Sequence, residues 1–346
     1  MICVLACFEG ARVLVTGAAG FLGVHLTGRL KRQGCVLFGL DEIESAAPTG
    51  FARFMVGDLA LEAERCIAEL RPDVVFHLAG GASVNDAVRD PDGDFDGSVP
   101  ATARLLAAAG RAARPPKLVF FSSAAVYGEA EALPVRETDP LCPISPYGAH
   151  KAACEALFEH YARIYGLPVA ILRIFSAYGE GLRRQFFWDF ATRALQAAAR
   201  GETSVLALGA GDETRDFIHA ADVARAACHV ALGMGDGPEV QVLNVASGQE
   251  TAIAAAAERV LAALGLDLEV RFKGAAMAGH PRRWRADVSR LAALGFRPER
   301  TLESELPRLA SWIAAQHAAA PARGMRPYPA TGQSPPPKHQ RRHIAR

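Results

Sequence analysis

The sequence predicts an α/β protein in which a doubly wound parallel sheet carries a smaller, mixed and mostly helical second region. Short apolar runs alternate with helix-length segments from the start of the chain. These runs are apolar almost throughout, as expected of strands that helices cover on both faces. A glycine-rich turn follows the first run, which is the position where a doubly wound fold carries a ligand.

Six apolar runs, separated by helix-length segments, are the expected strands of the sheet. They are RVLVTG (12–17), CVLFGLD (35–41), FMVGD (54–58), DVVFHLAG (73–80), KLVFFSS (117–123) and VAILRI (169–174). This alternation of apolar runs and helix-length segments ends after Ile174, and the residues that follow show no single secondary-structure pattern. A helix over 216–232 and a strand over 239–248 then resume the first pattern.

This change in the sequence pattern predicts two domains and a tail. We predict a first, ligand-binding domain over 1–176, rejoined by 216–247, and a substrate-binding region over 177–215 and 248–318. Residues 319–346 are rich in Pro, Gly, Arg and Gln, which predicts a disordered tail.

Composition limits the compartment and the partners. The 346-residue chain is half hydrophobic, but no apolar run approaches the roughly 20 residues that cross a bilayer. A net charge of +1 gives no electrostatic reason to expect a nucleic acid or a membrane as partner. Seven cysteines without a C-x-x-C pair, and histidines without ligand spacing, argue against a disulfide framework and a metal site. With no signal peptide visible at the start, we expect a reduced cytoplasm.

The turn after the first run reads TGAAGFLG, so Gly17, Gly20 and Gly23 open a helix as G-x-x-G-x-x-G. The first allows a tight turn, the second lets backbone N–H groups approach a pyrophosphate, and the third packs the helix on the strand. The spacing alone is weak, but its place after the first strand is informative. The second run ends in Asp41, whose carboxylate would accept hydrogen bonds from a ribose 2′-hydroxyl and repel a 2′-phosphate. The pattern therefore predicts NAD in preference to NADP.

Other candidate cofactor-binding residues lie next to the turn or at the ends of later runs. Asp58 ends the third run and either reaches the adenine or is a surface turn residue. The remaining candidates are Phe21, Leu22, Leu59, Leu78, Ala79 and Gly80.

The segment SPYGAHK contains a tyrosine and a lysine four positions apart. Ser145 is the expected N-cap of a helix and Pro146 its first residue, which places Tyr147 in the first turn. Lys151 then lies on the same face, and both the ammonium and the helix dipole would favour a phenolate. The alternative is a chance pair on a solvated helix.

Together these motifs resemble the extended short-chain dehydrogenase/reductases that act on nucleotide sugars, and are closest in pattern to UDP-hexose 4-epimerases. The resemblance covers about residues 11 to 315. Its motifs are TGAAGFLG, Asp41, HLAG (77–80), FSSAAVYG (121–128), SPYGAHK, RDFIHAADVA (215–224), NVASG (244–248) and WRADVSRLAALGFRP (284–298).

The resemblance implies a Rossmann fold, NAD as cofactor, a nucleotide-diphosphate sugar as substrate and a homodimer. It implies that Ser123 binds the reacting oxygen, that Tyr147 is the general acid/base, and that Lys151 holds the nicotinamide ribose. It further implies that Arg215 binds the substrate diphosphate. In the family the helix bearing Y-x-x-x-K and the helix before it form a four-helix interface with the same two helices of the second subunit. Apolar residues of EALFEHYARIYG would suit either that interface or an internal core: Ala156, Leu157, Tyr161 and Ile164.

Departures from the family pattern concern the substrate. Ser176 stands where members commonly have a diphosphate-binding Asn, and the usual N-V-x-G-T helix start appears as S-V-P-A-T at 98–102. Met277 and His280 stand where epimerases often have an Arg and an Asp. The residues that could replace the missing charge are Arg282 and Arg283. The base and sugar therefore stay undetermined.

The resemblance leaves several reactions open. Dehydratases need an Asp-Glu pair where this chain has Ala124 and Ala125, and Asp41 disfavours a ketoreductase that uses NADPH. The redox-neutral epimerase, which forms a transient 4-keto sugar, is therefore our interpretation. The reductase and dehydratase stay as alternatives, with a non-catalytic dinucleotide sensor as a different class.

Some residues in the motifs have structural interpretations. We expect His77 to be a packed residue at a strand end and not a catalytic one, and Ser122 to be structural. The aromatic residues Phe186, Phe187, Trp188 and Trp284 are expected in the core or in a pocket wall.

Overall fold

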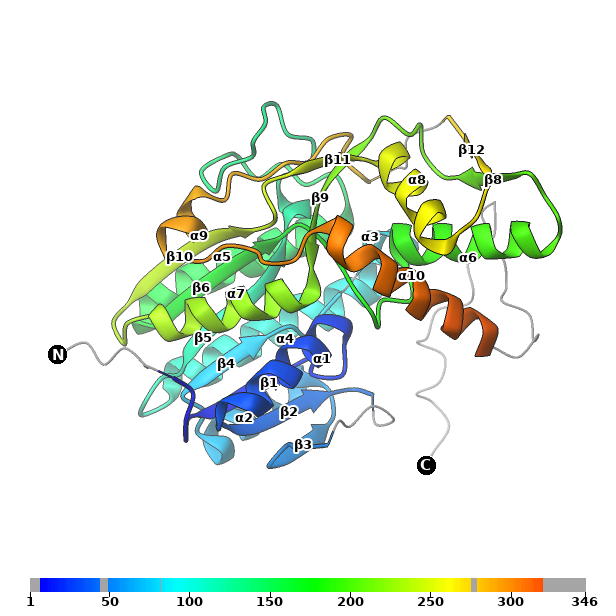
Figure 1. Cartoon of the computed structure of the whole chain (residues 1–346). Coiled ribbons are helices and arrows are strands. Elements are labelled where there is room, and N and C mark those ends of the chain that lie inside the picture. The colour runs from blue at the N-terminus through cyan, green and yellow to red at the C-terminus, as the bar shows by residue number, and fades with distance from the viewer. Residues whose placement is uncertain (1–6, 44–48, 82, 275–278, 320–346) are drawn as a thin grey trace, which may run out of the picture.

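The computed structural model describes residues 7–43, 49–81, 83–274 and 279–319, and its centre is a parallel sheet of seven strands (Figure 1). Their order across the sheet is β10-β6-β5-β4-β1-β2-β3, and every pair is parallel. The strands are β1 (Arg12–Thr16), β2 (Val36–Asp41), β3 (Arg53–Val56), β4 (Val74–His77), β5 (Lys117–Ser123), β6 (Pro168–Ile174) and β10 (Glu239–Val245). The predicted doubly wound parallel sheet is confirmed.

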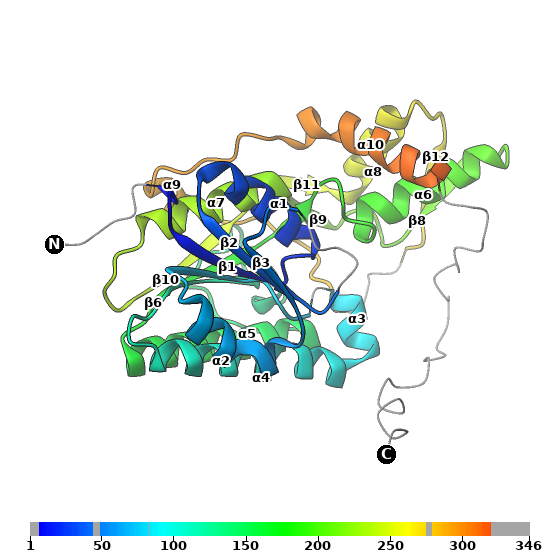
Figure 2. The same ribbon diagram turned by 90° about the horizontal axis from the view of Figure 1, so that it is seen from below.

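Helices cover both faces of this sheet, as the continuously apolar strands predicted. One face carries α1 (Phe21–Leu30) and α7 (Ala220–Gly233), and the other carries α2 (Leu59–Leu70), α4 (Pro91–Arg111) and α5 (Pro146–Tyr165) (Figure 2). Successive strand residues point to opposite faces, so Val13 and Val15 pack in the core beneath α1, whereas Leu14 packs beneath α2. The 3-10 turns η1 (Lys31–Gln33) and η3 (Ala124–Val126) follow α1 and β5.

Helix α4 begins well before the position that the resemblance indicated. The side chain of Asp90 accepts a hydrogen bond from the Gly93 N–H at 3.0 Å, and Pro91 occupies the first helical position. The S-V-P-A-T run at 98–102 therefore lies in the helix interior, and the expectation of a helix start there is wrong. The helix continues through Pro100, while α3 (Val84–Arg89) precedes it.

The second region lies beside the sheet and has its own aromatic core (Figure 1). Phe187 and Phe190 of its first helix are buried there, and Phe186 and Trp188 are partly buried, as expected. Its helices are α6 (Gln185–Ala199), α8 (Ile253–Leu264) and α10 (Leu302–Ala319). Helix α9 (Ser289–Ala293) lies between α8 and α10 in the chain but packs against β10, and its Leu291 is part of the core of the large sheet. Its strands are β7 (Ser176–Tyr178), β8 (Ser204–Ala207), β9 (Thr214–His219), β11 (Glu250–Ala252) and β12 (Glu269–Phe272). They form the sheets β11-β9-β7 and β12-β8.

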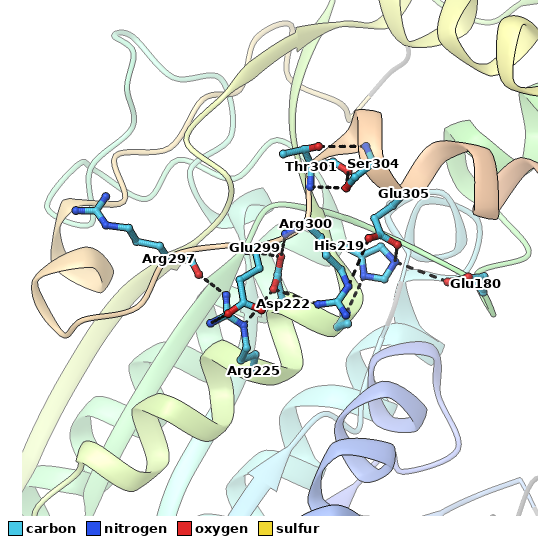
Figure 3. Close-up of polar contacts among 11 residues, drawn as sticks. Glu180, His219, Asp222, Arg225, Arg297, Glu299, Arg300, Thr301, Ser304 and Glu305 are labelled. Atoms are coloured by element: carbon cyan, nitrogen blue, oxygen red, sulfur yellow. Dashed lines mark hydrogen bonds and ion pairs between the residues drawn. The ribbon is translucent and has the colours of Figure 1, made fainter.

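A polar network around Asp222 ties α10 to α7 (Figure 3). Asp222 is fully buried, and its Oδ2 accepts hydrogen bonds from the backbone N–H groups of Glu299 at 3.0 Å and Arg300 at 2.8 Å. At the start of α7, His219 Nε2 lies 4.0 Å from a carboxylate oxygen of Glu305 on α10. Burial lowers the pKa of His219, so this contact joins the elements without a full ion pair at neutral pH.

The two-domain division at 176, 215 and 247 stays a prediction. Helix α10 extends to Ala319, and the rest of the predicted tail, 320–346, lies outside the described residues. No helix in the described ranges is long and apolar enough to cross a membrane. The same ranges contain no group of three or more His, Cys, Asp or Glu side chains that could hold a metal ion.

Candidate active site

The predicted site residues gather at the carboxyl edge of the seven-stranded sheet. Gly17 follows β1, Asp41 ends β2, Leu78 follows β4 and Ser123 ends β5. These strands are neighbours in the order β5-β4-β1-β2, so the four positions adjoin one another. The chain order reverses between β4 and β1, which is where doubly wound sheets bind their ligands.

The turn after β1 requires glycine at two of its three glycine positions. Gly17 has a φ of +69°, and a Cβ there would lie 2.8 Å from the backbone N of Ala79. A Cβ on Gly23 would lie 2.2 Å from the carbonyl oxygen of Gly17. Gly20 is the N-cap of α1 and, as a glycine, supplies no side-chain cap to the first N–H groups of this helix. Those N–H groups and the positive helix end therefore fit a pyrophosphate.

Asp41 lies against this turn. Its Oδ2 accepts a hydrogen bond from the Ala19 N–H at 2.9 Å, and its Oδ1 accepts one from the Ile43 N–H at 3.1 Å. The carboxylate is thus held at the phosphate turn, where a ribose hydroxyl could donate to it and a 2′-phosphate would meet a like charge. These residues fit NAD, and the individual contacts stay predictions.

The HLAG run forms the wall that faces the phosphate turn. The backbone of Leu78 and Ala79 lies so close to Gly17 that no side chain fits between them. Gly80 has a φ of +125°, and a Cβ there would lie 3.0 Å from Ser98 Oγ. The wall is therefore fixed from one side by the turn and from the other by α4.

The other cofactor candidates have mixed positions. Phe21 and Leu22 are the first residues of α1 and are partly buried. Asp58 is exposed and caps α2, since its Oδ1 accepts from the Ala60 N–H at 2.8 Å. Leu59 is buried in the core beneath α2. The roles of Asp58 at the adenine and of Leu59 stay predictions.

His77, at the end of β4, is a fully buried and paired residue. Its Nδ1 lies 2.8 Å from Thr16 Oγ1, and its Nε2 lies 3.0 Å from Thr102 Oγ1. Thr102 donates its hydroxyl hydrogen to the Ser98 carbonyl, so it accepts from the imidazole, and we assign the neutral tautomer with a proton on Nε2. Burial, with a smaller effect of the Lys151 charge, lowers the pKa of His77 to about 3. This position is that of a packed strand-end residue.

Tyr147 and Lys151 lie on one face of α5, whose N-cap is Ser145 as predicted. Lys151 is buried, and its Nζ donates a hydrogen bond to the Phe121 carbonyl oxygen at 3.2 Å. The same Nζ lies 5.9 Å from the ring centroid of Tyr147 and 5.1 Å from that of Phe120. Among the described residues no carboxylate pairs with this ammonium, so two of its three N–H groups are free to bind a ligand and to stabilise a phenolate.

The turn that carries Ser123 packs against the start of α5. Ser123 is partly exposed, and its Oγ accepts a hydrogen bond from the Ala125 N–H at 3.2 Å. Ala124 and Ala125 are buried, and Tyr147 packs against the same apolar cluster. The structure therefore brings the serine turn, the tyrosine and the lysine together, and the two positions directly after Ser123 carry methyl groups and not carboxylates.

Arg215, on β9, is the basic residue best placed to bind an anion. Its Nη1 donates to the Thr214 carbonyl at 2.6 Å, and its guanidinium lies 5.5 Å from the ring centroid of the buried Trp284. Burial lowers its pKa, and no carboxylate in the described part of the chain forms an ion pair with it. Ser176 lies on the neighbouring β7, opposite Phe217, and its substrate contact stays a prediction.

The two arginines expected to replace a missing charge are already paired. Arg282 is exposed and forms an ion pair with Asp212. Arg283 is also exposed and contacts the Glu250 carboxylate at 2.9 and 3.1 Å. Their substrate roles stay predictions, and each would have to exchange a carboxylate partner for the substrate.

Sequence reasoning missed Asn85, on α3. His280 Nε2 donates a hydrogen bond to the side-chain oxygen of Asn85 at 3.2 Å. Burial, aided by the nearby Arg215 charge, lowers the pKa of His280 to about 4, so the ring is neutral at neutral pH. No spacing in the sequence joins residues 195 positions apart. Met277 lies outside the described residues.

Comparison with known proteins shows which sequences and folds this chain is similar to. The model of the NAD-dependent epimerase/dehydratase family matches residues 13–246. A putative UDP-glucose 4-epimerase of Methanocaldococcus jannaschii is 30% identical over 311 residues, covering 87% of this chain and 98% of that protein. A UDP-glucose 4-epimerase of Mycolicibacterium smegmatis is 34% identical over 301 residues, covering 83% and 94%. The structure of the Thermus thermophilus UDP-glucose 4-epimerase in complex with NAD has a TM-score of 0.76 at 32% identity, covering 88% of this chain and 99% of that one.

Proposed function

Because the chain belongs to the NAD-dependent epimerase/dehydratase family, we propose that it is an NAD-dependent epimerase of a nucleotide-diphosphate sugar that works through a transient 4-keto sugar. The observation that carries this proposal is the convergence of Tyr147 and Lys151 with the Ser123 turn at the carboxyl end of β5. The phosphate turn and Asp41 lie along the same sheet edge, which supports one site for a dinucleotide and a proton-transfer group.

Each residue of the trio has one task in this reaction. NAD, when bound, supplies the acceptor and donor of hydride. Tyr147 takes the proton of the sugar hydroxyl and returns it after the keto sugar has turned over. Ser123 donates a hydrogen bond to the same oxygen as its charge changes. Lys151 stabilises the phenolate by its charge and binds the nicotinamide ribose with its free N–H groups.

A UDP-hexose is the substrate class that the relatives favour, because those compared above are named UDP-glucose 4-epimerases. Arg215 would bind the diphosphate, since it is a half-buried guanidinium without a carboxylate partner among the described residues. Arg282 and Arg283 are less suited to this task because Asp212 and Glu250 neutralise them.

The alternatives have weaker support in the site. A dehydratase needs an acid and a base beside Ser123, but Ala124 and Ala125 are buried methyl groups. A reductase that uses NADPH would place a phosphate at the Asp41 carboxylate. A non-catalytic sensor would have no use for the buried Lys151 and the adjacent Tyr147.

The test is a product assay with purified protein. It would be incubated with UDP-, GDP-, CDP- and dTDP-hexoses, with and without added NAD, and the products resolved by NMR. We expect interconversion of two epimers at C4 with no net change in NAD. Net oxidation or reduction of the cofactor, or loss of water from the sugar, would instead support the reductase or the dehydratase.

We further propose a homodimer in a reduced cytoplasm. The core face of α5 contains Lys151 and Phe158, whereas Ala156 and Ile164 point outward, and Ile164 is 68% exposed. Leu157 and Tyr161, the other two apolar residues named for this helix, pack against the core, so the exposure of Ala156 and Ile164 alone favours an interface. Helix α4 packs beside α5 on the same outer layer, so both are available to a second copy (Figure 2). The six described cysteines are free, in keeping with that compartment.

A further inference from the structure

Two side chains of α5, the helix that carries the tyrosine and lysine, hydrogen-bond to consecutive residues of strand β5. Lys151 Nζ donates to the Phe121 carbonyl oxygen at 3.2 Å. One turn later on the same helix face, Glu155 accepts a hydrogen bond from the Ser122 hydroxyl. The next strand residue is Ser123. Two contacts therefore fix the helix along the strand directly before the residue that must meet the substrate with Tyr147.

The Glu155 carboxylate is suited to hold this position because it is buried and fully paired. Its Oε2 accepts from Arg173 Nη2 at 2.7 Å, and Arg173 Nε lies 3.1 Å from both carboxylate oxygens. Ser122, Glu155 and Arg173 are all less than 5% exposed. A charge-assisted bidentate pair in such surroundings has one favoured geometry, so it transmits the position of one element to the next.

The far side of the network is anchored as well. Arg173 lies on β6, and its Nη1 donates to Tyr127 Oη and to the Glu137 carbonyl oxygen, each at 3.0 Å. Tyr127 in turn donates to the side chain of Asn244 on β10 at 2.7 Å. The ion pair therefore connects α5 to three strands of the sheet, and α5 cannot slide without breaking it.

From these contacts we infer that Ser122 and Glu155 are positioning residues, which set the placement of Tyr147 and Lys151 relative to Ser123. The inference rests on the proposed function for its kinetic part. It also concerns NAD binding directly, because Lys151 depends on the same docking to present its ammonium to the ribose. Misplacing a reacting group by about 1 Å can cost about a hundredfold in rate.

The test compares Ser122→Ala, Ser122→Thr and Glu155→Gln with Ala162→Gly, a control that weakens α5 two turns further on, where Ala162 is buried in the core. For each variant, Tm, the Kd for NAD by calorimetry, and kcat and KM would be measured. Ser122→Ala and Glu155→Gln should lower kcat by about tenfold or more with KM changed less than about threefold, and should weaken NAD binding severalfold. Ser122→Thr keeps the hydroxyl and should restore both.

The control separates positioning from stability. Ala162→Gly should lower Tm by a similar amount and leave kcat and the NAD Kd within about twofold of wild type. If Ser122→Ala behaves like Ala162→Gly in kcat and in NAD affinity, the inference is overturned. If Glu155→Gln does not fold, the comparison of Ser122→Ala with Ser122→Thr tests the inference. If wild type turns over no nucleotide sugar, the proposed function fails, and the order of NAD affinities still tests the inference.

Discussion

Replacing His77 should remove a specific part of the pH dependence of folding. Both ring nitrogens of His77 are hydrogen-bonded in the neutral form, and burial lowers its pKa from 6.5 to about 3. A second proton on Nδ1 would confront the Thr16 hydroxyl, which donates to that nitrogen and already accepts from the Ala79 N–H. The folded state therefore resists protonation between pH 6.5 and about 3, while the unfolded chain does not.

The size of this stability change follows from the pKa of 6.5 in the unfolded state and the pKa of about 3 in the folded state. Above pH 6.5 both states hold a neutral ring and the stability is fully present, and it is lost progressively as the pH falls toward 3. At about pH 5 the unfolded state gains about 2 kcal/mol from protonating this histidine, at 1.36 kcal/mol for each pKa unit. His77→Gln keeps an amide that can bond one threonine, but it cannot take up the proton.

Urea unfolding at about pH 7.5 and pH 5 measures the effect. Between about pH 7.5 and pH 5 the free energy of unfolding of wild type should fall by about 2 kcal/mol more than that of His77→Gln. The other buried histidines are common to both proteins and contribute equally to the two changes. Equal losses in wild type and His77→Gln would refute the assignment of a buried neutral imidazole.

The remaining predictions concern the cofactor, the chemistry and the assembly. Wild type should bind NAD in preference to NADP in calorimetry, and Asp41→Ser should narrow the difference; equal affinities in wild type would contradict the role of Asp41. Tyr147→Phe should abolish turnover with NAD binding nearly intact, Lys151→Ala should also weaken NAD binding, and Ser123→Ala should slow turnover by about 10- to 1000-fold. Activity of Tyr147→Phe within about tenfold of wild type would exclude it as the acid/base. Light scattering should show a dimer at micromolar concentration and a shift toward monomer in Ile164→Asp, and a wild-type monomer would reject the interface.

The strands and the phosphate turn could be predicted because their physical requirements are local. All six apolar runs became strands of one sheet, since a strand buried on both faces needs a continuous apolar stretch. The positive φ of Gly17 and the close backbone contact at Gly23 require residues without a Cβ. Such requirements can be recognised from spacing alone.

The start of α4 could not be predicted in the same way. The resemblance placed a helix start at 98–102, but the capping carboxylate of Asp90 and the following Pro91 begin the helix earlier. A proline in a helix interior is normally disfavoured, so no local signal indicates that a helix continues through Pro100. Packing of α4 between α2 and α5 outweighs that local preference.

The surroundings of Arg215, the proposed substrate side of the site, were harder to predict because one buried carboxylate joins distant segments there. Asp216 follows Arg215 on β9 and is fully buried, and its Oδ1 accepts from both the N–H and the hydroxyl of Ser247. Its Oδ2 accepts from the N–H groups of Gly248 and Ala286 at 3.0 and 3.1 Å. The position of Arg215 thus depends on hydrogen bonds to residues about 30 and 70 positions away, which no local pattern reveals. In the cofactor half, backbone geometry allows few residue types; in the substrate half, a shared acceptor leaves neighbouring side chains free to differ, so this half can diverge from the family pattern while the fold is kept.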